Sequence, residues 1–271
     1  MNIAKRVKRI LRRQTTAREF LSDHRVLVGT HHKTGTVWLQ SIFTEIAEQT
    51  GLSLYSGDVG NLQDGHDIFF QDHSHFGDEI LKGDAYRGVH IIRDPRDIVI
   101  SGMFYHQKSS EPQLHRPREE FGGASYQQKL NSIESLYEQL DFEMRNAALH
   151  TTRDMAAWDY RNPRFMEVKY EDLIADEDLT RFREIFAFLG FRDRAIPMCL
   201  EIAYDKSLFS GKVKKSLHVR SGESNQWQEH LTEAHRRSFL ELHGDLLVRL
   251  GYEEDDSWVK PATASHRNRD S

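Results

Sequence analysis

The sequence has almost no cysteine. Cys199 is the one cysteine among 271 residues, so no internal disulfide can form. A reducing compartment, the cytoplasm, is therefore the expected location. Cys199 stands beside Leu200 and close to Ile202, and we expect its side chain to fill part of a hydrophobic core.

Long apolar runs are missing as well, and so is an excess of basic residues. No stretch is long and apolar enough for a signal peptide or a membrane span. With 37 Lys and Arg against 42 Asp and Glu, the net charge is −5, which argues against general binding to nucleic acid. A site for an anion must therefore be a local concentration of basic groups.

Basic residues do concentrate near the start of the chain. Residues 1–20 combine several Lys and Arg with apolar residues at helical spacing, which predicts a basic amphipathic helix. Such a helix makes peripheral contact with an anionic membrane surface, or it is solvated or packed on a partner. We divide the chain into this helix, one domain at 21–252, and a mobile tail at 253–271.

The usual nucleotide-binding loop is absent too, because the chain contains no Gly-Lys-Ser/Thr triplet. Residues 26–40 instead read as an apolar strand, a tight turn holding Lys33 and Gly35, and a helix. A turn of this kind directs backbone N–H groups and the positive end of the helix dipole at one point. The pattern predicts a site for phosphate or sulfate that uses no metal, and an ordinary turn with a solvated lysine is the alternative.

A second strand, turn and helix follow at residues 88–105. Asp94 suits the N-cap of the helix and Pro95 its first turn. Arg93 ends the strand, and Ser101 lies about two helical turns further on, so that both can reach one phosphate. The alternative is a surface ion pair between Arg93 and Asp94 or Asp97.

Strands alternate with helices along the chain. Apolar runs at 26–29, 68–70, 88–92 and 164–170 predict strands, whereas helical patterns fall at 36–49, 95–105, 126–150, 179–189 and 232–250. This alternation predicts an α/β chain with a three-layer P-loop-like fold, in which helices flank a central parallel sheet on both faces. Ligands of such sheets bind at the carboxyl ends of the strands.

Four stretches, in order, resemble the signatures of the PAPS-dependent sulfotransferases, which use 3'-phosphoadenosine 5'-phosphosulfate (PAPS) as the sulfuryl donor. Residues 32–38 are similar to Pro-Lys-Ser-Gly-Thr-Thr-Trp, and residues 93–97 with Ser101 to Arg-x-Pro-x-Asp and its serine. Residues 170–173 match Tyr-Glu-Asp-Leu, and residues 220–227 resemble Arg-Lys-Gly-x-x-Gly-Asp-Trp. The departures from these signatures are His32, Val37, Ser221, Asn225 and Gln226.

The resemblance implies PAPS as co-substrate, without metal. It implies that Lys33 holds the 5'-phosphosulfate and neutralises the bridging oxygen as the bond to sulfur breaks. Adenine then lies against Trp38 and Tyr170, and the 3'-phosphate is clamped by Arg93, Ser101 and residues 220–222. The residues implied to bind the donor are Lys33, Thr34, Gly35, Thr36, Val37, Trp38, Arg93, Ser101, Tyr170, Arg220, Ser221 and Gly222.

The acceptor must lose a proton as it attacks sulfur, and histidine suits that task near neutral pH. In the resembled family the base is a histidine after a strand, shortly upstream of the second signature, and Asp72-His-Ser-His75 occupies that place. We take His75 as the base, with His73 as the second choice and Lys33 as the other catalytic group. A surface or packing role is the alternative for either histidine.

The sequence thus predicts a sulfotransferase that moves a sulfuryl group from PAPS to an acceptor hydroxyl, or to an amine, by in-line displacement. A small-molecule kinase of the P-loop type and a non-catalytic nucleotide-binding protein are the alternatives. Small-molecule, lipid and carbohydrate acceptors remain open, as does the oligomeric state. Five aromatic residues near the predicted site line an apolar acceptor pocket or fill the core: Phe69, Phe70, Phe76, Phe104 and Tyr105.

Overall fold

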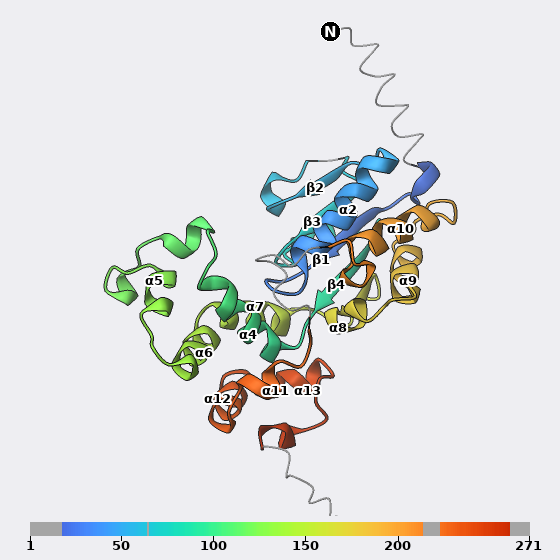
Figure 1. Cartoon of the computed structure of the whole chain (residues 1–271). Helices are drawn as coiled ribbons and strands as arrows, with labels where there is room; N and C mark the ends of the chain where they lie inside the picture. The colour runs from blue at the N-terminus through green and yellow to red at the C-terminus, as the bar shows by residue number, and fades with distance from the viewer. Residues whose placement is uncertain (1–17, 64, 214–222, 261–271) are drawn as a thin grey trace, which may run out of the picture. The chain divides into compact units, whose positions relative to one another are not determined.

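One parallel β-sheet forms the centre of the fold (Figure 1). The structure is a computed structural model that describes residues 18–63, 65–213 and 223–260. Within these residues the strand order is β2-β3-β1-β4-β5, and all neighbouring pairs are parallel. The predicted α/β fold with a central parallel sheet is therefore confirmed. The strands are β1 (Arg25–Gly29), β2 (Leu54–Ser56), β3 (Ile68–Gln71), β4 (Tyr86–Ile92) and β5 (Phe165–Lys169).

The described residues fall into two compact units, one comprising residues 18–63, 65–93 and 153–213, the other residues 94–152 and 223–260. The domain boundaries expected at residues 20 and 252 stay predictions, and the basic helix at 1–20 lies outside the described residues except for 18–20. No helix in the described part of the chain is both long and apolar enough to cross a membrane. The first unit holds the sheet with α2 (Thr36–Thr50), η1 (Val59–Asn61), α3 (Asp78–Leu81), α8 (Tyr170–Ile174), α9 (Thr180–Phe188), α10 (Ile196–Lys206) and η4 (Leu208–Ser210).

The second unit is helical. Its elements are α4 (Pro95–His106), η2 (Pro112–His115), η3 (Glu119–Phe121), α5 (Tyr126–Asn131), α6 (Leu136–Arg145), α11 (Trp227–His230), α12 (Glu233–His243), α13 (Leu246–Arg249) and η5 (Asp256–Val259), and α7 (Ala147–Ala157) crosses the boundary between the units.

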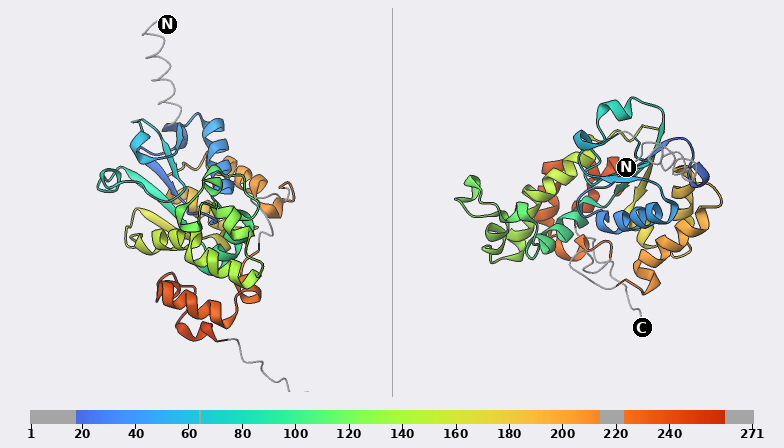
Figure 2. Two further views of the ribbon diagram at one scale, coloured as in Figure 1. Left: turned by 90° about the vertical axis from the view of Figure 1, so that its left-hand side faces the viewer. Right: turned by 90° about the horizontal axis from the view of Figure 1, so that it is seen from above.

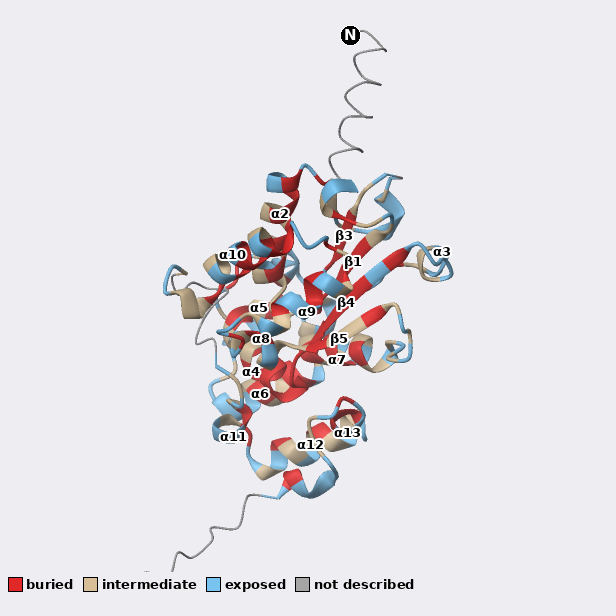
Figure 3. Ribbon diagram, turned by 90° about the vertical axis from the view of Figure 1, so that its right-hand side faces the viewer, coloured by how far each residue is buried: buried red, intermediate tan, exposed pale blue. Residues whose placement is uncertain are grey.

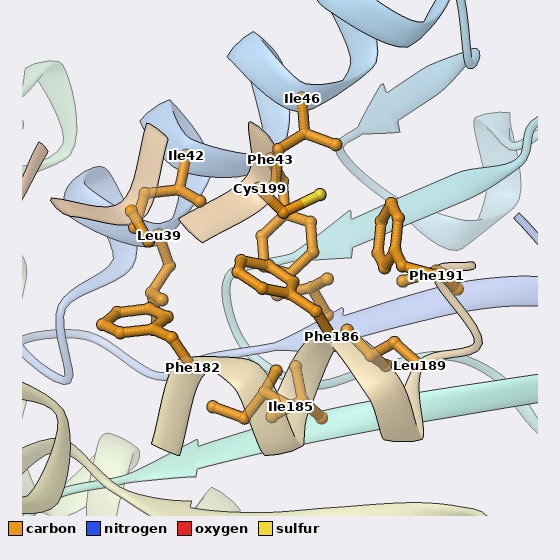
Figure 4. Close-up of a cluster of buried hydrophobic side chains, with 14 of the residues drawn as sticks. Leu39, Ile42, Phe43, Ile46, Phe182, Ile185, Phe186, Leu189, Phe191 and Cys199 are labelled. Atoms are coloured by element: carbon orange, nitrogen blue, oxygen red, sulfur yellow. The ribbon is translucent and has the colours of Figure 1, made fainter. Parts of the chain in front are cut away.

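Helices α2, α9 and α10 cover one face of the sheet (Figures 1 and 2). Alternate residues of the strands, such as Val26, Val28 and Ile91, meet the apolar sides of these helices in one buried cluster. Cys199 on α10 is fully buried in this cluster (Figure 4), which confirms its predicted role in the core. Both faces of β1 and β4 are buried over most of their length (Figure 3), as expected for the central strands of a parallel sheet.

The other face of the sheet begins apolar and becomes polar toward the carboxyl ends of the strands. Leu27 and Phe69 pack there with Phe165, and Gly88 makes room for that ring, since a Cβ on residue 88 would lie 2.2 Å from Phe165 Cε1. Two residues further along, His90 on β4 stands opposite Glu167 on β5. The polar part of this face is therefore at the edge where ligands of parallel sheets bind.

Two helices that the sequence predicts as continuous are broken in the structure. The prediction of one helix at 126–150 is wrong, because α5, α6 and α7 occupy this stretch and Asn146 leaves helical geometry with φ −122° and ψ −100°. The helix predicted at 232–250 starts at the Thr232 cap as expected but stops at Gly244, whose φ of 55° separates α12 from α13. The irregular stretch at 52–67 contains the short edge strand β2 and η1.

A buried arginine organises the second unit. Arg96 on α4 is 2 % exposed, and its Nη2 lies 2.7 Å from the carboxylate of Asp94, the N-cap residue. Its guanidinium carbon lies 3.6 Å from the centroid of the Trp227 ring and 4.8 Å from that of Trp258, and it also pairs with Glu253. The stretch at 253–260, which the sequence assigns to a mobile tail, thus contributes to this packing, and residues 261–271 lie outside the described part.

Replacing Arg96 with alanine should lower the free energy of unfolding by about 3–5 kcal/mol, because it removes the ion pair of the buried Asp94 carboxylate. The matched control is Arg237→Ala on α12, where the arginine side chain is 65 % exposed and pairs with Glu233 one turn away. That change should cost less than about 0.5 kcal/mol. Denaturant titration of both variants measures the difference, and equal costs would contradict the structural role of Arg96.

Candidate functional site

The turn between β1 and α2 is stabilised by its own threonines. The Thr34 hydroxyl donates to the His31 carbonyl at 2.9 Å and accepts from the His31 N–H at 2.8 Å, while the Thr36 hydroxyl donates to the same carbonyl at 2.9 Å. The first hydrogen bond within α2 runs from the Leu39 N–H to the Gly35 carbonyl. The Thr34 N–H donates to the His31 carbonyl at 3.1 Å, so the N–H groups at the start of α2 are the ones that an anion would contact.

The turn has strained backbone geometry at its functional centre. Lys33 has a φ of 67°, which costs a residue with a Cβ about 1–3 kcal/mol. Gly35 has a φ of 93° and serves as the N-cap of α2. Nη1 of Arg93, at the end of β4, donates to the Lys33 carbonyl at 3.0 Å and so holds the strained residue from the neighbouring strand.

Aromatic rings lie against this turn. The Tyr170 ring, at the start of α8, is so close that a Cβ on residue 35 would lie 3.0 Å from its Cδ2. The guanidinium carbon of Arg93 lies 4.7 Å from the centroid of the same ring, and Trp38 meets the ring edge-on at 6.2 Å. The structure therefore brings together Lys33, Gly35, Trp38, Arg93 and Tyr170, all of which the sequence predicts to bind the donor.

The two candidate bases stand on a loop that is fixed to the same strand ends. The Gln71 side chain accepts from the backbone N–H groups of His73 and His75 at 2.6 and 3.1 Å. Between them Ser74, with a φ of 58°, donates its hydroxyl to the Thr30 carbonyl at 2.9 Å. The loop therefore lies next to the turn that carries Lys33.

Both imidazoles of this loop reach solvent. The side chain of His73 is 49 % exposed and that of His75 is 65 % exposed. They lie 3.9 and 3.5 Å from the carboxylate of Asp154 on α7, and their ring centroids are 6.1 Å apart. Asp154 has no distinctive setting in the sequence, and the sequence analysis did not identify it.

A chain of buried polar side chains starts beneath the turn. Nε2 of His31 lies 2.7 Å from Nε2 of His90, and Nδ1 of His90 lies 2.5 Å from a carboxylate oxygen of Glu167. The other oxygen of Glu167 accepts from the Trp158 indole N–H at 2.8 Å, and the Trp158 and His90 rings stack at 4.1 Å. Sequence reading missed these residues, because His90 stands in an apolar run and its pairing with Glu167 depends on strand register.

Burial determines the charge of His31, His90 and Glu167. It lowers the pKa of His31 well below its usual range and that of His90 to about 3, while it raises the pKa of Glu167 to about 7. Both imidazoles are therefore neutral at physiological pH. Glu167 is the member of the chain that changes charge near pH 7.

A family model described as the sulfotransferase domain matches residues 73–251. The chain belongs to this family. The predicted class of enzyme, a transferase of sulfuryl groups, is thereby confirmed. The match begins after the turn with Lys33, so the role of that turn rests on its geometry and on its signature.

Solved sulfotransferase-like structures share the fold. The crystal structure of mouse sulfotransferase SULT7A1 complexed with PAP has 18 % sequence identity and a TM-score of 0.59 to this chain. The match covers 84 % of this chain and 85 % of the chain of the mouse protein. Retinol dehydratase in complex with androsterone and inactive cofactor PAP has 13 % identity and a TM-score of 0.52, with 82 % and 80 % covered. Among curated proteins, no sequence matches significantly.

The roles of the other residues predicted to bind the donor stay predictions. Ser101 lies on α4 in the second unit, Val37 is 51 % exposed on α2, and residues 220–222 lie outside the described part of the chain. Within the second unit the last residue of the third signature, Trp227, donates its backbone N–H to Asp97 of the second signature at 3.0 Å. The shared grip of Arg93 and Ser101 on one phosphate stays a prediction.

Proposed function

We propose that the chain transfers a sulfuryl group from PAPS to a hydroxyl of a small-molecule acceptor. The observation that carries this proposal is the gathering of Lys33, Arg93 and Tyr170 at one strand-to-helix turn. An ammonium, a guanidinium and an aromatic face are what a phosphosulfate, a second phosphate and a purine need. The PAP seen in the structural neighbours is the same carrier without its sulfuryl group.

The reaction is an in-line displacement at sulfur. A bond forms between the acceptor oxygen and sulfur, the bond from sulfur to the phosphate oxygen breaks, and the acceptor proton goes to a base. Charge grows on the leaving phosphate, where the Lys33 ammonium and the first N–H groups of α2 stabilise it. His75 takes the proton, and its exposed side chain beside the Lys33 turn supports this role, with His73 as the alternative.

The details of the turn favour sulfuryl transfer over the kinase alternative. In a P-loop kinase the hydroxyl after the lysine binds magnesium. Here that residue is Thr34, which is fully buried and has its hydroxyl engaged with both backbone groups of His31. The lysine turn is therefore arranged for an anion bound through nitrogen donors.

The acceptor class is the finer part of the proposal. Four of the aromatic residues near the predicted site are each at most 5 % exposed and therefore fill the core: Phe69, Phe70, Phe76 and Tyr105. Other residues must therefore contact the acceptor. Retinol dehydratase, one of the structural neighbours, is in complex with androsterone in one structure and with retinol in another. These two ligands support a small apolar alcohol as the first class of acceptor to test. Lipid, carbohydrate and amine acceptors are the other outcomes.

The direct test is transfer of labelled sulfate from PAPS to a panel of acceptors from these four classes. Turnover on apolar alcohols is the expected result. Turnover confined to another class would revise the acceptor, and turnover on none, together with binding of PAP, would favour the non-catalytic alternative.

Arg93→Ala should weaken the binding of adenosine 3',5'-bisphosphate (PAP) by about 10- to 100-fold, because a charge-assisted contact to phosphate contributes roughly 1.5–3 kcal/mol. Arg87→Ala is the matched control, since Arg87 is exposed near the amino end of the same strand. Calorimetric titration of both variants with PAP measures the effect. Equal affinities of the two variants would show that Arg93 does not bind the donor.

A further inference from the structure

The buried chain of Glu167, His90 and His31 continues to an open end. Nδ1 of His31 is buried, and none of residues 18–63, 65–213 and 223–260 offers it a hydrogen-bond partner. An unpartnered buried nitrogen costs about 1–3 kcal/mol, so it calls for an explanation other than stability. The hydrogen-bonded series of side chains therefore has one open end at His31 and one anchored end at Glu167.

The two ends differ in their access to water. His31 and His90 are at most 1 % exposed, whereas the side chain of Glu167 is 28 % exposed. A proton that reaches Glu167 can therefore leave to solvent. One that enters at His31 must pass through His90, because its Nε2 faces the Nε2 of that residue.

The residue before the open end is in contact with the loop that carries the candidate bases. Desolvation by burial is the main cause of the lowered pKa of His31, and repulsion from His90, then from His73 and His75, lowers that pKa further. Ser74 between them is hydrogen-bonded to Thr30, the residue before His31. Asp154 faces the two loop histidines, Trp158 donates to Glu167, and Arg181 donates to the backbone carbonyl of Glu167. The Tyr160 ring lies 5.8 Å from the ring of His90.

We propose that His31, His90 and Glu167 form a buried proton relay that carries the proton released by the acceptor from the His73 and His75 pair to Glu167. The relay rests on the proposed sulfuryl transfer. An acceptor bound at His75 displaces water from that imidazole, so a route away from the acceptor clears the base for the next turnover. These three residues act through the base and are relay residues.

One proton can pass along the relay while both buried imidazoles stay neutral. With Glu167 ionised, His90 donates from Nδ1 to the carboxylate, and His31 donates from Nε2 to Nε2 of His90, which leaves Nδ1 of His31 as an acceptor. A proton then binds Nδ1 of His31, the proton on its Nε2 moves to Nε2 of His90, and the proton on Nδ1 of His90 moves to Glu167. Both rings end neutral in the opposite tautomer, and Glu167 ends as a carboxylic acid.

The tautomers of His31 and His90 can be measured by NMR, which tests the relay without an assay of sulfuryl transfer. Long-range ¹H–¹⁵N correlation spectra of the labelled full chain, assigned with the His31→Gln and His90→Phe variants, should show Nδ1 of His31 bare at pH 9 and protonated at pH 5.5. His90 should switch in the opposite sense at its Nδ1, and Glu167→Gln should give one pattern at all pH values. Unchanged tautomers in the wild-type chain would overturn the relay.

Kinetics test the relay under turnover. Glu167→Gln should lower kcat at pH 7.5 by at least about tenfold, less than the ~10²–10⁴-fold contribution of the base itself, and should leave the Kd for PAP unchanged. It should also change the shape of the pH profile of kcat near pH 7, because the carboxylate that receives the proton, with a pKa of about 7, is gone. A uniform fall in kcat with the same profile would mean a structural role and would overturn the proposal.

The matched control is Glu143→Gln, which alters a buried carboxylate that also contacts a histidine. Glu143 lies 3.0 Å from Nδ1 of His106 and accepts from the Tyr126 hydroxyl at 2.7 Å, within the second unit. It should leave the shape of the pH profile unchanged. If no acceptor is ever sulfated, the tautomer spectra still test the relay; if transfer is found and the tautomers do not switch, the relay fails and the proposed function stands.

Discussion

Replacing Lys33 with methionine lowers kcat for sulfuryl transfer by about 10²–10³-fold, the loss typical of removing one group that stabilises charge in the transition state. Methionine keeps the length and the apolar stem of lysine, and the turn keeps its Arg93 contact, because that contact is made to the backbone carbonyl of residue 33. PAP should therefore still bind, with a smaller loss than in kcat. Single-turnover kinetics with labelled PAPS measure the rate.

Lys82→Met is the control for this substitution. Lys82 follows α3, its side chain is 79 % exposed, and it pairs with Asp78. We expect its removal to leave kcat unchanged. A Lys33→Met enzyme with the wild-type kcat would show that the charge on the leaving phosphate is stabilised by other groups.

Replacing His75 with asparagine should lower kcat by about 10²–10⁴-fold, the range of a general base. Asparagine keeps a polar side chain, and the backbone bond from residue 75 to Gln71 is unaffected. The Kd for PAP should not change. The measurement is kcat at saturating donor and acceptor, paired with calorimetric binding of PAP.

His73→Asn is the internal comparison, because the two histidines share a loop and both face Asp154. A smaller loss in His73→Asn than in His75→Asn identifies His75 as the base. The reverse order would move the role to His73. Wild-type rates in both variants would exclude this loop from proton transfer.

Local sequence signals predicted the parts of the fold that local interactions determine. Asp94 accepts from the Arg96 N–H at the N-cap, and Pro95 occupies the first turn of α4, as their types require. Helix α2 runs from Thr36 to Thr50, within one residue of the predicted end, because Gly51 with a φ of 73° stops it.

Other features depend on tertiary context and were beyond sequence reading. The break between α6 and α7 falls at Asn146, where the apolar helical pattern continues, so periodicity alone predicts one helix. The pairing of His90 with Glu167 follows from the register of β4 on β5. A shift of one residue would place these side chains on opposite faces of the sheet.

The candidate site shows the same division. The signature residues identified Lys33, Arg93 and Tyr170, which lie together in the structure. The signatures gave no sign that the Thr34 hydroxyl is occupied within the turn, or that Asp154 on α7 faces the two histidines. Such contacts join residues far apart in the chain, and only the folded arrangement reveals them.

The central claim is that the Lys33 turn and Arg93 bind the two phosphorylated ends of one adenosine carrier. Calorimetric titration of the wild-type chain with PAP, and separately with ATP and magnesium, tests it most directly. The account predicts one PAP site with a Kd of about 1 μM or tighter, equivalent to ~8 kcal/mol, and much weaker binding of ATP. No heat with PAP, or tighter binding of ATP with magnesium, would contradict it.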